Sequence, residues 1–126
     1  MGVQLRVLII DDNEAIRMIL TDMLLDLGHQ VVAEAESQEA ALAAFAEHKP
    51  DLVTLDLSLS ASGGGDGITV LKALQKADPK VRVIVISGNA QNKVKATVDA
   101  AGAMAFISKP INEAELAAAV ANAQLP

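Results

Sequence analysis

The sequence alternates short aliphatic runs with longer stretches in which apolar residues recur every three or four positions. The aliphatic runs predict strands, because near-continuous Val, Ile and Leu are typical of parallel strands that are covered on both faces. We expect these strands at residues 5–10, at a short segment that starts at 31, and at 51–56, 81–86 and 104–107.

The longer stretches predict helices between these strands. The first is the clearest, because one face of it would be formed by Ile16, Ile19, Leu20, Met23, Leu24 and Leu27. Polar residues suited to cap the first, second, third and last helices are Asn13, Ser37, Asp66 and Asn112. The fourth helix, expected at about residues 90–101, has only a thin apolar stripe of Val94 and Val98.

Five strand–helix units in succession predict an α/β fold with a parallel sheet and helices on both of its faces. Right-handed crossovers then restrict the topology. The one break in composition is the loop at 58–67, and it is too short to separate two domains. We therefore expect a single domain over residues 1–126.

Polar residues follow four of the five predicted strands. Asp11 and Asp12 follow the first strand, and Asp56 ends the third. Ser87 ends the fourth strand and Lys109 follows the fifth, whereas the second strand supplies no comparable group. Because the binding crevice of an open α/β sheet lies at the carboxyl ends of its strands, we expect these side chains to converge.

The converging groups indicate phosphoryl-transfer chemistry. Three carboxylates at one edge repel each other and need a cation, and Mg²⁺ prefers oxygen ligands. A lysine and a hydroxyl beside the metal would complete the groups that stabilise a transferring phosphoryl group. An aspartate can itself be the nucleophile and form an aspartyl-phosphate. Each residue alone could instead be a helix cap or a solvated charge, but their coincidence on four strand ends favours a functional site.

With these residues in this order, the sequence resembles the receiver domains of bacterial two-component response regulators over essentially its whole length. The resemblance is to stand-alone receivers of the chemotaxis-regulator type. It implies a doubly wound, flavodoxin-like (βα)5 fold with strand order 2-1-3-4-5. It also implies a signalling switch rather than an enzyme, whose only chemistry is its own phosphorylation and autodephosphorylation.

The resemblance assigns metal and acceptor roles. Asp56 would accept a phosphoryl group from a histidine kinase or a histidine phosphotransfer protein. Asp12 and Asp56 would bind Mg²⁺ directly, together with the main-chain carbonyl of Ser58. Asp11 would act through a metal-bound water.

The resemblance also implies how the signal leaves the site. Lys109 would contact the phosphoryl oxygens, and Ser87 would shift toward them. Phe106 would couple its rotamer to Ser87, and the Lys109–Pro110 bond would be cis. A downstream protein target would then bind the face formed by the fourth helix, the fifth strand and the fifth helix.

The loop after Asp56 departs from the family pattern. Many receivers have a proline four residues after the acceptor, where this chain has Ser60. The glycines at 63–65 lengthen the loop and lack the spacing of a phosphate-binding motif, so we interpret them as a flexible loop. Ser58 and Asn89 stand where the family tunes autodephosphorylation.

Composition excludes several other classes. A net charge of −6 argues against direct nucleic-acid binding, and the absence of cysteine excludes disulfides and thiolate metal sites. No signal peptide or membrane span is recognisable, so we expect a cytoplasmic protein. We interpret His29 and His48 as solvated residues in connecting regions.

Two alternatives to a stand-alone switch remain open from the sequence. The chain could be the receiver portion of a larger regulator. It could also be a Mg²⁺-dependent phosphotransferase or phosphatase with an aspartate nucleophile. Enzymes of the haloacid dehalogenase type carry Asp-x-Asp after the first strand, whereas Asp11 and Asp12 are adjacent. A nucleotide-binding domain would need a glycine-rich turn after the first strand, which this chain lacks.

Overall fold

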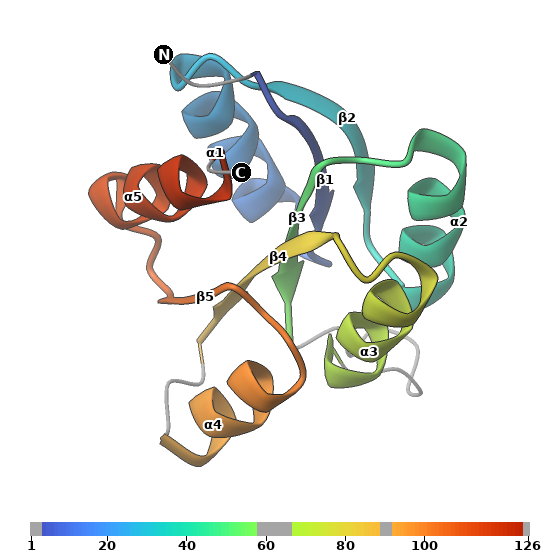
Figure 1. The fold of residues 1–126 in the computed structure, drawn as a ribbon. Coiled ribbons are helices and arrows are strands. Elements are labelled where there is room, and N and C mark those ends of the chain that lie inside the picture. The colour runs from blue at the N-terminus through green and yellow to red at the C-terminus, as the bar shows by residue number, and fades with distance from the viewer. Residues whose placement is uncertain (1–3, 58–66, 89–91, 125–126) are drawn as a thin grey trace.

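The computed structural model describes residues 4–57, 67–88 and 92–124, and contains the predicted alternation of strands and helices (Figure 1). The strands are β1 (Arg6–Ile10), β2 (Gln30–Ala35), β3 (Leu52–Asp56), β4 (Arg82–Ser87) and β5 (Ala105–Ser108). The helices are α1 (Glu14–Asp26), α2 (Gln38–His48), α3 (Gly67–Ala77), α4 (Asn92–Ala100) and α5 (Glu113–Ala123).

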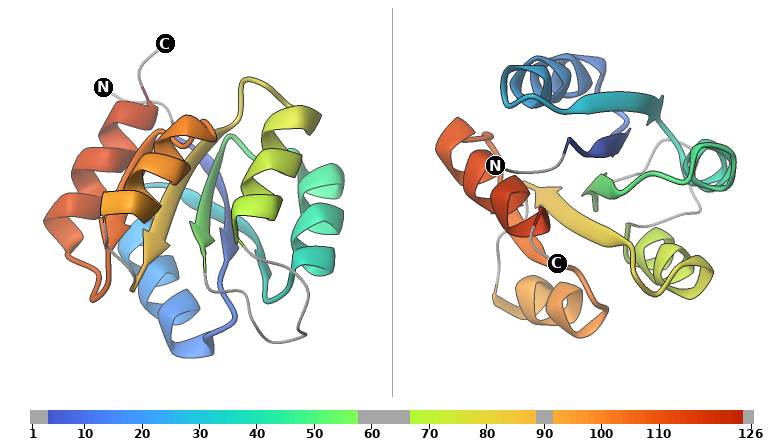
Figure 2. Two further views of the ribbon diagram at one scale, coloured as in Figure 1. Left: turned by 90° about the horizontal axis from the view of Figure 1, so that it is seen from below. Right: turned by 45° about the horizontal axis from the view of Figure 1, so that its top comes forward.

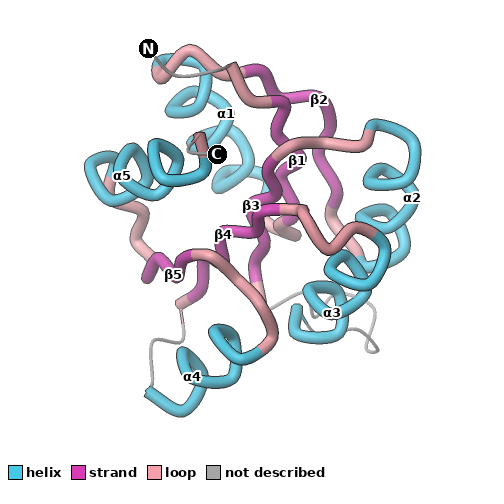
Figure 3. Tube along the Cα trace, viewed as in Figure 1, coloured by secondary structure: helices cyan, strands magenta, loops and turns pink. Residues whose placement is uncertain are grey.

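The strands form one parallel sheet in the order β2-β1-β3-β4-β5, which confirms the predicted topology. The five helices surround the sheet, with α1 and α5 on one face and α2, α3 and α4 on the other (Figures 2 and 3). All strand ends that carry the candidate residues therefore lie at one edge of the sheet.

Each face of the sheet has its own apolar core. β3 contributes to both, because alternate residues of a strand point to opposite faces. Val53 and Leu55 pack with the residues of α2 and α3, whereas Leu52 packs with those of α1 and α5. Every residue of β3, including the terminal Asp56, is buried, so this strand is the centre of the fold.

The predicted caps of three helices are present. The side chains of Asn13, Ser37 and Asn112 accept hydrogen bonds from the main-chain N–H groups three residues later. These bonds satisfy donors that have no partner within the helix, and they fix where α1, α2 and α5 begin. The predicted cap of α3, Asp66, lies outside the described residues.

Two expectations about helices need correction. Ile19 was expected in the buried face of α1, but 43% of it is exposed, and the buried residues of that helix are Leu20 and Leu24. The stripe that meets the sheet is therefore narrower than the apolar spacing suggests. α4 ends at Ala100, one residue before the expected end at Ala101, whereas its expected start at residue 90 lies outside the described residues.

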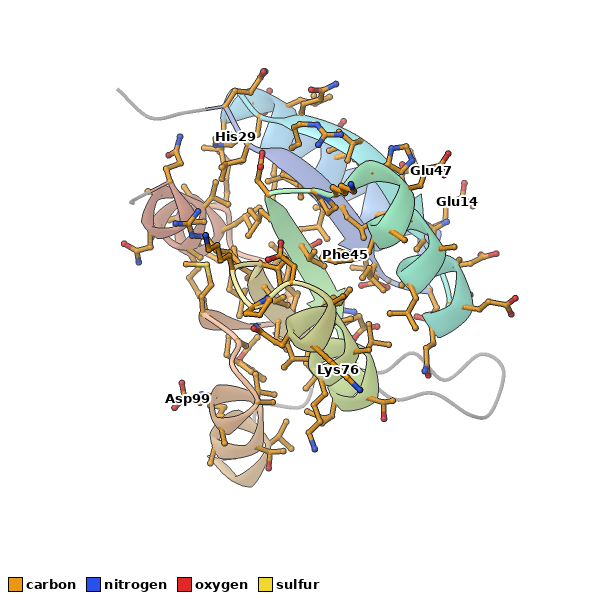
Figure 4. The ribbon with its side chains drawn as sticks, turned by 45° about the vertical axis from the view of Figure 1, so that its right-hand side comes forward. Glu14, His29, Phe45, Glu47, Lys76 and Asp99 are labelled. Carbon is orange, nitrogen blue, oxygen red and sulfur yellow. The ribbon has the colours of Figure 1, made fainter. Side chains whose placement is uncertain are left out.

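The interpretation of His29 as a solvated residue is wrong, and His48 belongs to a helix rather than to a connecting region. His29 lies between α1 and β2 (Figure 4). It is only 5% exposed, and its Nδ1 accepts a hydrogen bond from the main-chain N–H of Leu5 at 3.0 Å. His48 is the last residue of α2 and is partly buried. A polar side chain in a turn can be buried when it satisfies a main-chain group that the sheet leaves unpaired, and sequence periodicity gives no signal for this.

None of the described helices is long and apolar enough to cross a membrane.

His29 gives the fold a predictable response to acid. Burial lowers the pKa of His29 below its ordinary value of 6.5, so the folded protein binds this proton less readily than the unfolded chain. The stability that neutral His29 contributes is therefore present above pH 6.5 and is lost as the pH falls below it. We expect His29→Asn, which keeps an acceptor for Leu5 but cannot titrate, to lose less stability than the native protein between about pH 7 and pH 5.5.

Urea unfolding followed by circular dichroism at several pH values measures this difference. His29→Leu, which leaves the Leu5 N–H without its acceptor, should lose about 1–3 kcal/mol at neutral pH. His48→Gln is the matched control and should follow the native protein. An acid response of His29→Asn equal to that of the native protein would show that His29 does not titrate as described.

Candidate functional site

Three carboxylates meet at the carboxyl edge of the sheet. Asp11 and Asp12 lie between β1 and α1, and Asp56 is the last residue of β3, which pairs with β1. One carboxylate oxygen from each of Asp11, Asp12 and Asp56 lies within 4.8 Å of the other two. The predicted convergence of these residues is therefore present in the structure.

Lys109 is the cation of this cluster. Its Nζ lies 3.1 Å from Oδ2 of Asp11 and 3.5 Å from Oδ2 of Asp56. The side chains of Asp11 and Asp56 are only 1% and 2% exposed, and burying such charges is costly unless they are paired. One ammonium group facing three carboxylates leaves an excess of negative charge at the edge of the sheet.

The β1–α1 turn holds Asp11 at several atoms. Its main-chain N–H donates to the carbonyl of Ala35 at 3.0 Å, which ties the turn to the end of β2. Its Oδ1 accepts from the N–H of Asn13 at 2.8 Å, while Oδ2 accepts from Lys109. Its carbonyl accepts from Nη1 of Arg17 at 2.8 Å. The orientation of the Asp11 carboxylate is thus fixed by main chain and side chain together.

Ser87 and Lys109 are connected through the main chain. The N–H of Lys109 donates to the carbonyl of Ser87 at 2.9 Å, one step beyond the pairing of Ser87 with Ser108. Ser87 is completely buried at the end of β4, whose Ile86 pairs with Asp56. The Lys109–Pro110 peptide bond is cis. The ends of β3, β4 and β5 therefore form one continuous polar edge.

A glycine brings α3 close to the end of β3. A Cβ atom at Gly67 would lie 2.4 Å from Cα of Leu57 and 2.8 Å from the carbonyl oxygen of Asp56, so no other residue fits without a backbone shift. The N–H of Gly67 donates to the carbonyl of Leu57 at 3.0 Å. Leu57, which directly follows Asp56, is thus hydrogen-bonded to the first residue of α3.

Phe106 lies on β5, beside α4. It is partly buried against the core on the α2, α3 and α4 side of the sheet. Nζ of Lys95, on α4, is 5.8 Å from the centre of its ring, which is within the range of a cation–π contact. In the structure Phe106 therefore contacts the helix next to it.

Several residues singled out from the sequence lie outside the described residues. They are Ser58, Ser60, Gly63, Gly64, Gly65 and Asn89. Their expected roles in metal binding and in autodephosphorylation stay predictions.

Sequence reasoning missed Arg17 and Glu34. Nε of Arg17 lies 3.1 Å from Oε1 of Glu34, in addition to the contact of Arg17 with the Asp11 carbonyl. The second strand, which appeared to supply nothing to the site, thus contributes through this arginine. The sequence carries only a weak signal for this pair, which consists of one glutamate within a strand and one arginine in the first turn of a helix.

The donor set fits a hard divalent cation. All three side chains present carboxylate oxygens, which Mg²⁺ prefers, and Asp12 is the most accessible of the three. A Mg²⁺ ion usually keeps several waters and takes only one or two carboxylates, so an accessible cluster suits it better than a closed cage. The residues that would hold the ion belong to the cluster of Asp11, Asp12 and Asp56.

Comparisons with known proteins agree with this geometry. Residues 7–121 match the response regulator receiver domain. The chain is 41% identical over 105 residues to the chemotaxis protein CheY of Bacillus subtilis, covering 83% of this chain and 85% of that protein. It is 36% identical to the chemotaxis protein CheY of Thermotoga maritima, covering 91% and 93%.

A solved structure similar to this one is a chain of the CheX–CheY–BeF3–Mg²⁺ complex from Borrelia burgdorferi. The TM-score is 0.89 at 29% identity, over 96% of this chain and 90% of that chain. The chain shares the fold of this solved structure and matches the family over residues 7–121. This chain belongs to the response regulator receiver domain family.

Proposed function

We propose that residues 1–126 form a single receiver domain that works as a phosphorylation-dependent switch in a two-component phosphorelay. Asp56 accepts the phosphoryl group from a histidine kinase or a histidine phosphotransfer protein, and a downstream protein then binds the altered surface. The observation that carries the proposal is the position of Asp56, buried at the end of the central strand and within reach of both Lys109 and two further carboxylates.

The transfer is a substitution at phosphorus. A carboxylate oxygen of Asp56 forms a bond to phosphorus while the bond between phosphorus and the donor's imidazole nitrogen breaks, and the nitrogen keeps the electron pair. Mg²⁺, when bound, neutralises charge on the transferring group. Lys109 donates hydrogen bonds to the phosphoryl oxygens, which its present distances of 3.1 Å to Asp11 and 3.5 Å to Asp56 allow with a small movement.

The cluster of three carboxylates and a similar solved structure both support the binding of Mg²⁺ in this proposal. The Borrelia burgdorferi complex that resembles this chain contains Mg²⁺ and BeF3, and it also contains a protein partner, CheX. We infer that the carboxylates of Asp12 and Asp56 bind Mg²⁺ here, with the Ser58 carbonyl as a further ligand and Asp11 acting through water.

The signal would leave through β4 and β5. Phosphorylation adds charge and strong acceptor oxygens at Asp56, which favours movement of the Ser87 hydroxyl toward them. Ser87 is joined to Lys109 by a main-chain hydrogen bond, and Phe106 lies three residues before that lysine. Among the described side chains of α4, Val98 is fully buried and Val94 packs partly buried against the core. The α4, β5 and α5 face is therefore the proposed partner surface.

Loss of the acceptor tests the proposal directly. With Mg²⁺ and a small acyl-phosphate donor, the native protein should gain one labile phosphoryl group by intact mass. Asp56→Asn should gain none, because an amide is not a nucleophile of this kind, and chelation of Mg²⁺ should abolish labelling. Asp51→Asn, which changes an exposed acid just before the same strand, is the matched control and should be labelled normally. Equal labelling of Asp56→Asn and native protein would refute the assignment.

Loss of the Lys109 ammonium group should raise the affinity for Mg²⁺ and lower the rate of phosphoryl transfer. Lys109→Gln removes a positive charge that competes with Mg²⁺ for Asp11 and Asp56. Without this charge the repulsion of Mg²⁺ should fall by about 1 kcal/mol, which corresponds to about fivefold tighter Mg²⁺ binding. The labelling rate at saturating Mg²⁺ should fall by about a hundredfold, since a donor to the transferring group is lost.

Nuclear magnetic resonance titration with Mg²⁺ and a time course of intact mass measure the two effects of Lys109→Gln. Lys80→Gln, which removes an exposed charge before β4, is the control and should change neither quantity. Weaker Mg²⁺ binding by Lys109→Gln would contradict the placement of the ammonium group as a competitor for the carboxylates.

A further inference from the structure

Arg17 connects three elements around the acidic cluster. It lies on α1, its Nη1 donates to the carbonyl of Asp11 after β1, and its Nε pairs with Glu34 on β2. A guanidinium group can hold two acceptors at once because its N–H donors form a rigid planar fork. Arg17 and Glu34 together line a cavity of about 310 Å³ beside the site, on the β2 side.

The carbonyl that Arg17 holds controls the direction of Asp12. A peptide unit is planar, so the Asp11 carbonyl and the Asp12 nitrogen belong to one rigid plane. Fixing this carbonyl fixes the rotation of the plane, and hence the position from which the Asp12 side chain leaves the main chain. Asp11 itself is anchored at its N–H and at both carboxylate oxygens, and the bond from the Asn13 N–H to Oδ1 already spans the same plane. Arg17 adds a second restraint, which acts directly on the carbonyl of that plane.

The pair with Glu34 orients Arg17 more than it stabilises the fold. Glu34 is 46% exposed and Arg17 15% exposed, and an ion pair in such surroundings contributes little to the free energy of folding. Its effect is geometric, since it sets the rotation of the guanidinium group so that Nη1 points at Asp11. Glu34 thereby acts on the site through Arg17 and not through its own charge.

The structure points to Arg17, oriented by Glu34, as a positioning residue for the metal-binding carboxylate of Asp12. This inference rests on the proposed function, because it concerns the Mg²⁺ site of that function. It assigns no contact between Arg17 and the metal or the phosphoryl group.

The direction in which Mg²⁺ affinity changes when Arg17 is replaced distinguishes a positioning role from a purely electrostatic one. If Arg17 acted only as a nearby positive charge, its removal would favour Mg²⁺ binding, as expected for Lys109→Gln. If Arg17 positions Asp12, then Arg17→Gln weakens Mg²⁺ binding despite the lost positive charge. Groups that orient metal ligands typically contribute at least tenfold to affinity, so we expect Mg²⁺ to bind about tenfold more weakly.

The chain offers a matched control at the other end of β1. Nη1 of Arg6 donates to the carbonyl of Lys49 at 3.1 Å, which is the same type of contact, about 16 Å away along the strand. Arg6→Gln changes the net charge by the same amount and should leave Mg²⁺ affinity unchanged.

The experiment is a Mg²⁺ titration of the native protein, Arg17→Gln, Glu34→Ala, the double variant and Arg6→Gln, followed by nuclear magnetic resonance. Glu34→Ala should weaken Mg²⁺ binding severalfold and should add nothing in the Arg17→Gln background. In the metal-free proteins, the amide of Asn13, which donates to Asp11, should exchange with solvent faster in Arg17→Gln than in the native protein. At saturating Mg²⁺ the rate of acyl-phosphate labelling should recover toward that of the native protein.

Unchanged or tighter Mg²⁺ binding by Arg17→Gln would overturn the inference, and native affinity of Glu34→Ala would overturn the part given to Glu34. Should Arg17→Gln fail to fold, which circular dichroism detects, the Mg²⁺ titration of Glu34→Ala decides the matter in its place. If the native protein itself bound no Mg²⁺ and accepted no phosphoryl group, the proposed function would fail instead, so the two failures are distinguishable.

Discussion

The pairing of Lys109 with the buried carboxylates of Asp11 and Asp56 is the constraint on which the site depends. An ammonium group 3.1–3.5 Å away compensates the charge of these carboxylates, whose side chains are only 1–2% exposed. The same pairing connects β1, β3 and the segment after β5, which are distant in the sequence. Since one lysine does not balance three carboxylates, the cluster has a built-in affinity for a further cation.

This constraint also explains how a local change can reach a distant surface. The atoms that would respond to a phosphoryl group sit on the ends of β3, β4 and β5, whose main chains are hydrogen-bonded to one another. A shift of Lys109 or Ser87 acts on β5 because Lys109 follows that strand directly. Phe106 contacts α4, and its ring already meets Lys95 there. In the proposed switch the sheet therefore transmits the change at the site, and α4 receives it through Phe106.

The fold and the main site residues could be predicted because they follow strong periodic signals. Aliphatic runs identified the strands, and the polar residues at their ends identified Asp11, Asp12, Asp56 and Lys109. His29 could not be predicted to be buried, since its partner is a main-chain N–H that no side-chain pattern reveals. Arg17 was missed for a related reason, because its acceptor is a carbonyl. Gly67 was noted only as part of a loop. Glycine is required there because two backbones approach so closely that a Cβ atom has no room, and the sequence does not reveal this approach.

Identification of the modified residue tests the central claim most directly. After labelling with an acyl-phosphate donor and Mg²⁺, borohydride reduction converts a phosphorylated aspartate into homoserine, which peptide mass spectrometry locates. If Asp56 is the acceptor, homoserine appears at position 56 and at no other aspartate. Homoserine at position 11 or 12, or at none of the aspartates of a protein that had gained a phosphoryl group, would contradict this assignment.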